Sequence, residues 1–278
     1  MNSIEFMLVV GTVAASAGFL GSLTGLGGGV VLTPVLTLLL GVDLRYAIGA
    51  TIVSVIATSS GAAAAYVREG LSNIRIGMLL EIATTTGAIC GALLASSLPT
   101  SALGTILGVV LAFAAWQSTR PQPTSSENIV SDPLALRLRL NSTVPGPAGP
   151  EPYGVLRVKL GFALMYGAGL LSGLLGIGSG AFKVIAMDQA MRIPFKVSTA
   201  TSNFMIGVTA AASAGVYLSR GYIDPILSMP VVLGVLAGSV VGARILPGAK
   251  TRVLRLVFAA VVGLLALQMI YSGMARRI

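Results

Sequence analysis

The sequence contains no histidine, a single cysteine and few charged residues, and each shortage excludes a class of protein. Without histidine, and with Cys90 alone in an apolar stretch, the chain lacks the ligands of a zinc site, a Cys-His nucleophile and an internal disulfide. Only 10% of its residues are charged, whereas a soluble domain carries roughly a quarter. We therefore expect no metal, no cofactor, no catalytic residues and no ordinary water-facing surface.

What the chain has in abundance is apolar sequence. Hydrophobic residues make up 55% of it and the mean hydropathy is +0.91, which predicts a multi-pass membrane protein. The membrane that we expect it to occupy is the bacterial cytoplasmic membrane. The net charge of +9 then reports orientation in the membrane, so no nucleic-acid partner is expected. Residues 1–6 lack the basic region of a cleaved signal peptide, and we expect them to begin the first membrane helix.

A membrane-crossing helix needs about 20 apolar residues. Apolar segments of that length, with one shorter segment in each half, form two series separated by a proline-rich break. The first series covers 5–23, 28–40, 46–67, 75–97 and 101–118, and the second covers 158–175, 179–191, 196–218, 225–246 and 252–273. The expected organisation is a membrane unit at 1–118, a cytoplasmic connector at 119–156 and a second membrane unit at 157–278.

The connector contains two stretches, 134–140 and 155–160, in which apolar and basic residues alternate. A small amphipathic hairpin or a membrane-surface segment is one interpretation of this pattern. A solvated linker with basic anchors is the favoured one, because proline, serine and glycine surround both stretches.

The two membrane units match each other in sequence at one constant offset of 151 (176 − 25). The residues Gly18, Gly25, Gly27, Gly29, Arg45, Tyr66, Gly70, Gly87, Gly91 and Gln117 correspond to Gly169, Gly176, Gly178, Gly180, Lys196, Tyr217, Gly221, Gly238, Gly242 and Gln268. Chance does not hold such a register, so the chain is predicted to contain a duplicated unit.

The basic residues favour an inverted relation between the units. In one topology, each unit begins with a hairpin that returns to its starting side and then crosses the membrane three times, which places thirteen basic residues on one side and four on the other. In the alternative, each unit crosses the membrane four times, and the same residues divide ten to seven. The predicted fold is an all-α polytopic membrane protein of two inverted repeats, each a glycine-broken hairpin followed by three transmembrane helices. Segments 28–40 and 179–191 are short and suit re-entrant half-helices, although two full crossings have the same parity.

Glycine clusters mark the turns of both hairpins. They comprise Gly25, Gly27, Gly28 and Gly29 in the first unit and Gly176, Gly178, Ser179 and Gly180 in the second. Glycine lets bare N–H groups approach a ligand, and the following helix would point its positive end at the same place, so an anion site is the favoured interpretation. Close helix packing is the alternative, and it is the favoured one for Gly87, Gly91, Gly238 and Gly242.

These clusters, with Pro34 downstream of the first, resemble the duplicated signature of the TauE/SafE family of sulfite and organosulfonate exporters. The resemblance covers both units and not the connector. It implies a transporter of small anions such as sulfite, sulfoacetate or a related sulfonate, driven by an ion gradient. The second unit departs from the family's commoner pattern, because Ser179 replaces a third glycine and Lys183 and Asp188 stand where a proline would follow.

Lys183 is the leading candidate for a charged ligand. A lysine in the first turn of a membrane helix opposes the helix dipole, and a bound anion would compensate it. A structural ion pair is the alternative; Asp188 lies about 140° around the helix and is awkwardly placed, which leaves a partner on another segment. Asp188 and Glu81 are candidates for a coupling proton, the alternatives being structural roles near Arg192 and Arg75 respectively.

The segment after Lys196 is unusually polar for the start of a membrane helix. Its candidate pocket residues are Thr201, Ser202 and Asn203, with Ser198 and Thr199 beside them and Thr51 and Ser54 in the first unit. Asn203 is the best single candidate, and hydrogen bonds to the helix's own backbone are the alternative for the whole set.

The function predicted from these patterns is secondary transport of a small anion by alternating access, as an exporter coupled to an ion gradient. An anion channel and a non-transporting membrane subunit are the alternatives, and an enzyme is not expected because no catalytic dyad is present. The expected partners are the anionic substrate and the lipid bilayer, and a homodimer is left open.

Overall fold

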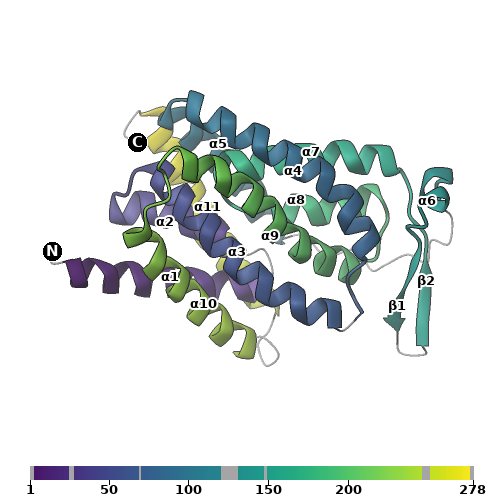
Figure 1. The fold of residues 1–278 in the computed structure, drawn as a ribbon. Coiled ribbons are helices and arrows are strands. Elements are labelled where there is room, and N and C mark those ends of the chain that lie inside the picture. Colours follow the sequence, from purple (N-terminus) through teal and green to yellow (C-terminus); the bar gives the residue numbers. More distant parts are fainter. Residues whose placement is uncertain are drawn as a thin grey trace.

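The computed structural model describes residues 3–24, 28–68, 70–119, 131–146, 149–245 and 251–275, which form a long helical bundle with a small folded connector at one end (Figure 1). The first unit contains α1 (Ser3–Thr24), α2 (Gly29–Leu40), α3 (Leu44–Arg68), α4 (Ile74–Ser97) and α5 (Thr100–Thr119). The connector contains α6 (Pro133–Arg137), β1 (Ser142–Gly146) and β2 (Gly149–Tyr153). The second unit contains α7 (Val158–Leu175), α8 (Gly180–Ile185), a π-helical turn η1 (Ala186–Ala190), α9 (Phe195–Ser219), α10 (Pro225–Ile245) and α11 (Thr251–Met274).

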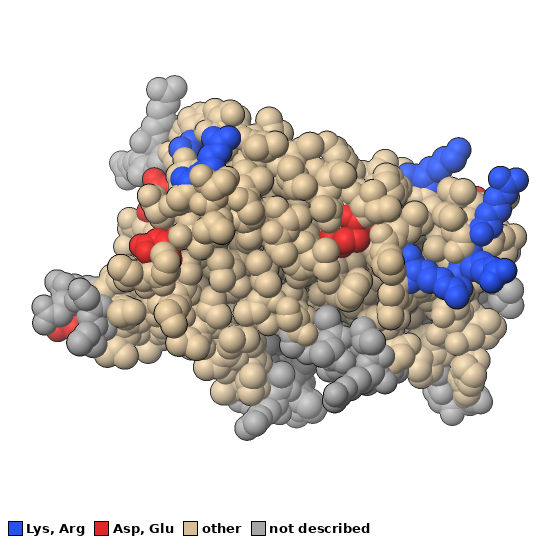
Figure 2. All heavy atoms as spheres, viewed as in Figure 1, with Lys and Arg blue, Asp and Glu red and all other residues tan. Residues whose placement is uncertain are grey.

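Every apolar segment expected from the sequence is helical, with bounds within two residues of those expected. The short segment 179–191 consists of α8 and η1 together. Four helices are long and apolar enough to cross a membrane when judged over the described residues, namely Ile74–Ser97, Thr100–Thr119, Val158–Leu175 and Leu256–Met274. On the face drawn in Figure 2, the Lys and Arg side chains gather toward the two ends of the bundle, and the middle is largely uncharged apart from one acidic spot.

Long helix pairs build the bundle: α1 lies along α10, α4 along α7 and α5 along α11, while α3 and α9 pack on each other between them. Glycines set the closest approaches. A side-chain carbon at Gly87 would overlap the Tyr166 carbonyl, and one at Gly91 would overlap the Leu170 carbonyl. Gly238 meets the Ala15 carbonyl in the same way. The packing interpretation is therefore confirmed for these three glycines; the surroundings of Gly242 lie outside the described side chains.

The start of α1 and the end of α11 lie at the end of the bundle opposite the β hairpin (Figure 1). Helix α2 lies in the half nearer the termini and α8 in the half nearer the hairpin. Each unit as a whole therefore leads the chain from one end of the bundle to the other.

The connector is folded where it is described, which corrects two expectations. Residues 142–146 pair antiparallel with 149–153, so the protein is mostly helical and not all-α. The favoured interpretation of a solvated linker is wrong for residues 131–156, since Leu140, Tyr153 and Val155 are buried in a cluster with Ile76 and Ile193. The hairpin also forms at different residues from the alternating stretches 134–140 and 155–160.

Asn73 fastens this connector to both units. Its Oδ1 accepts a hydrogen bond from the Ile76 N–H (3.1 Å) and caps α4, while its Nδ2 donates to the Leu140 carbonyl (2.9 Å) and the Tyr153 hydroxyl (2.8 Å). Its backbone N–H donates to Thr201 Oγ1 at the start of α9 (3.0 Å). Burial raises the pKa of Tyr153, so the phenol stays neutral near pH 7. Asn73 thus joins α4 to the connector through its side chain, and it joins α9 through its backbone N–H.

Asn73→Ala is expected to destabilise the protein by about 2 kcal/mol, because it removes a helix cap and leaves buried polar groups without partners. The measurement is thermal unfolding in detergent, together with protease cleavage within residues 131–156, which should accelerate. Asn141→Ala is the matched control, because Asn141 is exposed and its side chain bonds to the neighbouring Ser131. Equal melting temperatures for the two variants would contradict this role.

Candidate functional site

The second glycine turn is buried at the centre of the bundle. Gly176 (φ 69°) ends α7 by donating its N–H to the Ser172 carbonyl (2.8 Å), and Gly178 (φ 73°) and Ser179 (φ 45°) carry the chain into α8. Gly176 and Gly178 need this left-handed backbone, which other L-residues adopt only with strain. Ser179 adopts it at such a cost, and its buried hydroxyl has no hydrogen-bond partner among the described residues.

The start of α2 lies next to this turn. A side-chain carbon at Gly29 would lie 2.7 Å from Val55 Cγ2 and 3.5 Å from the Ile177 carbonyl, and one at Gly178 would lie 3.2 Å from Val55 Cγ1. Both hairpins therefore meet at Val55, in the middle of α3. Gly28 precedes α2 and is buried, whereas Gly25 and Gly27 lie outside the described residues.

Two of the expected pocket hydroxyls hold the hairpins in place. Thr51 Oγ1 accepts a hydrogen bond from Thr33 on α2 (3.0 Å), and Ser202 Oγ donates to the Gly180 carbonyl at the start of α8 (3.3 Å). Thr51 and Ser202 are corresponding residues of the two units (202 − 51 = 151). Each one joins a short hairpin helix to the long helix that follows it.

Lys183 is completely buried, and side chains of two other helices, α9 and α4, connect its ammonium group to a carboxylate. Its Nζ donates to Thr209 Oγ1 on α9 (2.5 Å), and Thr209 Oγ1 donates to Glu81 Oε1 on α4 (2.7 Å). Thr85 also donates to Glu81 Oε1 (3.0 Å), while Glu81 Oε2 is buried without a hydrogen-bond partner in the described part of the chain. Ammonium, hydroxyl and carboxylate thus form one buried hydrogen-bonded chain, which we call the Lys183–Thr209–Glu81 chain.

This chain decides between the structural alternatives for both charged residues. The partner of Lys183 lies on another segment, as one alternative proposed, and not at Asp188. Glu81 does not pair with Arg75, whose Nη1 donates to the Arg139 carbonyl (3.1 Å). Sequence reasoning missed Thr209. It stands seven residues after Ser202, two turns along the same face of α9, and this spacing could have identified it.

The remaining predicted residues lie around this chain with other partners. Thr201 accepts the Asn73 N–H, and Asn203 Nδ2 donates to the Thr199 carbonyl of its own helix (3.0 Å). Asp188 is half-buried in η1, where the charge of Arg192 acts on it. Neither Asn203 nor Asp188 therefore has a described contact with Lys183.

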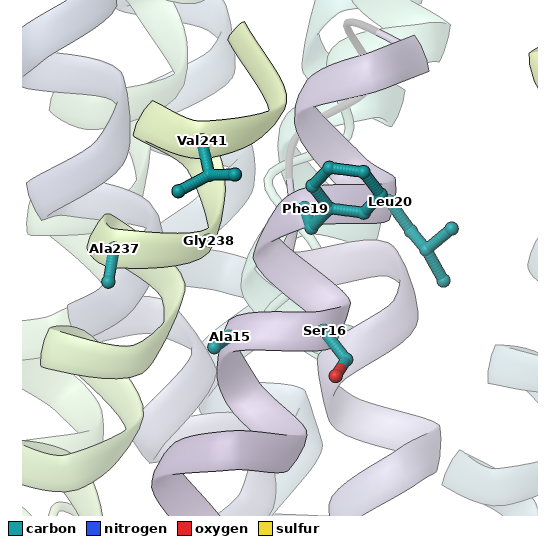
Figure 3. Close-up of a pocket in the computed structure, with 7 residues that line it drawn as sticks. All are labelled: Ala15, Ser16, Phe19, Leu20, Ala237, Gly238 and Val241. Atoms are coloured by element: carbon teal, nitrogen blue, oxygen red, sulfur yellow. The ribbon is translucent and has the colours of Figure 1, made fainter. Parts of the chain in front are cut away.

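A separate groove of about 530 Å³ lies between α1 and α10 (Figure 3). Small and apolar side chains line it, among them Ala15, Phe19 and Val241. Its polar side chain, Ser16, donates to the Thr12 carbonyl of its own helix. The described residues that line this groove offer no cation to an anion, so it differs in character from the Lys183–Thr209–Glu81 chain. Within the described residues, no group of three or more acidic or cysteine side chains could hold a metal ion.

Comparison with known proteins decides the family. The family model described as sulfite exporter TauE/SafE matches residues 10–269, nearly the whole chain. The chain belongs to the TauE/SafE family. The family resemblance found in the glycine clusters is thus confirmed, and this TauE/SafE protein is a multi-pass membrane protein of a transporter family and not an enzyme.

Curated relatives span most or all of this TauE/SafE chain. "Probable membrane transporter protein YunE" of Bacillus subtilis (strain 168) is 26% identical over 98% of both chains. "Probable membrane transporter protein YdhB" of the same organism is 26% identical over 86% of this chain and 88% of its own. No solved structure matches the chain significantly.

Proposed function

We propose that this protein is a secondary transporter that carries a small anion, such as sulfite, sulfoacetate or a related sulfonate, across the bacterial cytoplasmic membrane. The observation that carries the proposal is Lys183, a fully buried cation in the first turn after a glycine-rich turn at the centre of a transporter-family fold. A buried cation in a membrane protein is costly and generally marks a path for ions or substrates. Export is the direction that the description of the family model suggests, and the proposal couples that export to an ion gradient.

The proposed anion site centres on Lys183 and the free hydroxyl of Ser179, with Gly178 and Gly180 supplying backbone beside them. Gly28 and Gly29 approach from the first unit, and the proposed site also includes Gly176 and, from the sequence alone, Gly25 and Gly27. Thr51 and Ser202 would exchange their present partners for the anion. The bonds of Thr201 to Asn73 and of Asn203 to Thr199 favour packing roles for those two.

Symmetric contacts support two inverted repeats. Gly18 packs on Val235 and Gly169 on Thr84, and these partners differ by the repeat offset (235 − 84 = 151). Gly87 likewise packs on Tyr166 and Gly238 on Ala15 (166 − 15 = 151). Exchanging the two units reproduces the contacts. The termini lie opposite the connector, as an odd number of crossings per unit requires, which supports inverted repeats and alternating access. The excess of basic residues on the connector's side supports a cytoplasmic connector.

The test is anion uptake into proteoliposomes that contain the purified protein. We expect saturable uptake of at least one of sulfite, sulfoacetate, taurine, thiosulfate or a simple carboxylate, with an initial rate that responds to an imposed pH gradient. Flux that neither saturates nor responds to pH would identify an anion channel instead. Equal flux in protein-free liposomes for every anion would overturn transport and leave a non-transporting subunit.

A further inference from the structure

The Lys183–Thr209–Glu81 chain joins the two units, with Glu81 in the first and Lys183 and Thr209 in the second, and it is not repeated at the equivalent place. The residues that correspond to these three under the repeat are Leu32 and Thr58 in the first unit and Val232 in the second (183 − 32, 209 − 58 and 232 − 81 all equal 151). Leu32 is fully buried, and the Thr58 hydroxyl bonds to carbonyls of its own helix at Ser54 and Val55. The same packing position therefore accepts an uncharged residue, so the fold does not require a charge at it.

The chain is electrically balanced as it stands. Lys183 contributes one positive charge and Glu81 one negative charge, and each is the charged group that acts on the other. An anion that binds Lys183 brings a second negative charge into a buried, low-dielectric site. Two anions facing one buried cation are strongly unfavourable, and a carboxylate in that position takes up a proton instead.

The other titratable and charged groups on the surrounding helices do not supply that compensation. Lys159 on α7 and Lys196 on α9 are exposed, as is Arg75 at the start of α4. Asp188 in η1 interacts electrostatically with Arg192, and Tyr166 on α7 interacts with Cys90. Glu81 is therefore the group beside Lys183 that can change its charge, and Oε2 can accept a proton while the hydrogen bonds from Thr85 and Thr209 to Oε1 persist.

We infer that each monovalent anion bound at Lys183 is accompanied by one proton, taken from solvent onto Glu81 Oε2, so that the protein is a proton–anion cotransporter. This inference rests on the proposed transport function. Thr209 is the positioning residue between the two charges. The neutral pair of substrates moves without net charge, so export proceeds only while the cytoplasmic excess of the anion outweighs the inward proton gradient.

The experiment is isothermal titration of the purified protein in detergent with methanesulfonate and with sulfoacetate, in two buffers of different ionisation enthalpy. Methanesulfonate is informative because its charge is fixed at −1 near neutral pH. The difference in heat between buffers gives the number of protons taken up per bound anion. We expect about one proton for methanesulfonate, and an affinity that falls about tenfold per pH unit once Glu81 is ionised.

Glu81→Gln should bind the anion without proton uptake and without pH dependence, because glutamine has the shape of the protonated acid. Glu151→Gln is the matched control, since Glu151 is exposed on β2, and it should keep the wild-type proton count. Binding without proton uptake in the wild type, or uptake that persists in Glu81→Gln, would overturn cotransport alone. If the wild type binds neither methanesulfonate nor sulfoacetate, and binds no anion of the flux panel, the transport proposal and this inference are overturned together.

Discussion

Replacing Lys183 by methionine is expected to reduce anion transport to the level of protein-free liposomes and also to lower the stability of the folded protein. The substitution removes the cation from the proposed site. A hydrogen bond to a charged group contributes roughly 1.5–3 kcal/mol, so anion affinity should fall about 10- to 150-fold, which brings uptake at low anion concentration close to background. It also leaves Glu81 buried with no opposing charge, and losing one partner of a buried pair costs about 3–5 kcal/mol.

A second substitution separates these two effects. Lys183→Met combined with Glu81→Gln removes both charges, so thermal stability in detergent should return toward the wild-type value while transport stays absent. Lys159→Met is the matched control because Lys159 is exposed on α7, and it should keep both properties. If the double variant transports as fast as the wild type, Lys183 and Glu81 form a structural pair and the substrate site lies elsewhere.

The second large effect concerns the glycine contacts between α4 and α7. In Gly173→Ala, the new Cβ would overlap the backbone of Ala88, whose carbonyl lies directly opposite. Backbone cannot move aside as the end of a flexible side chain can, so the two helices must separate along their whole contact. We expect a loss of about 3 kcal/mol or more, seen as a lower melting temperature and poor recovery of folded protein from the membrane.

The same helix provides the control for this prediction. Gly167 also lies in α7, but no described atom lies within 4 Å of the position that its Cβ would occupy. Gly167→Ala should be neutral or stabilise the protein by up to about 1 kcal/mol, because alanine favours the helix more than glycine does. If Gly173→Ala melts at the same temperature as Gly167→Ala, the contact between α4 and α7 is looser than the structure indicates.

Much of the architecture could be predicted because the relevant information is local. Hydrophobic length defines membrane helices, and turn residues such as Gly41 and Gly70 separate them, so each helix appears within two residues of its expected bounds. The short segment after Gly178 was also predictable, since thirteen apolar residues are too few for a full crossing. The family followed from the spacing of glycines in the two clusters.

Features that depend on distant contacts were not predictable in this way. The connector folds because Asn73 and Ile76, more than sixty residues before Leu140, supply its polar and apolar partners. Glu81 and Thr209 are separated by 128 residues, and no periodicity within α4 or α9 indicates that they meet. The partner of Asn203 was not predictable either, because an amide in a membrane helix can face a ligand or bond to its own backbone, and here its Nδ2 donates to the preceding turn of its own helix.

The Lys183–Thr209–Glu81 chain has no copy at the positions that the repeat relates to it, and this asymmetry has an energetic consequence. In a carrier of two identical inverted halves, exchanging their conformations returns the same molecule turned over, so the states open to either side have equal energy by symmetry. Here Leu32 and Val232 stand where Lys183 and Glu81 would be repeated. For the proposed carrier, that degeneracy is lifted, and its empty form is expected to rest with a preferred opening. Substrate affinities measured from the two faces of the membrane should then differ.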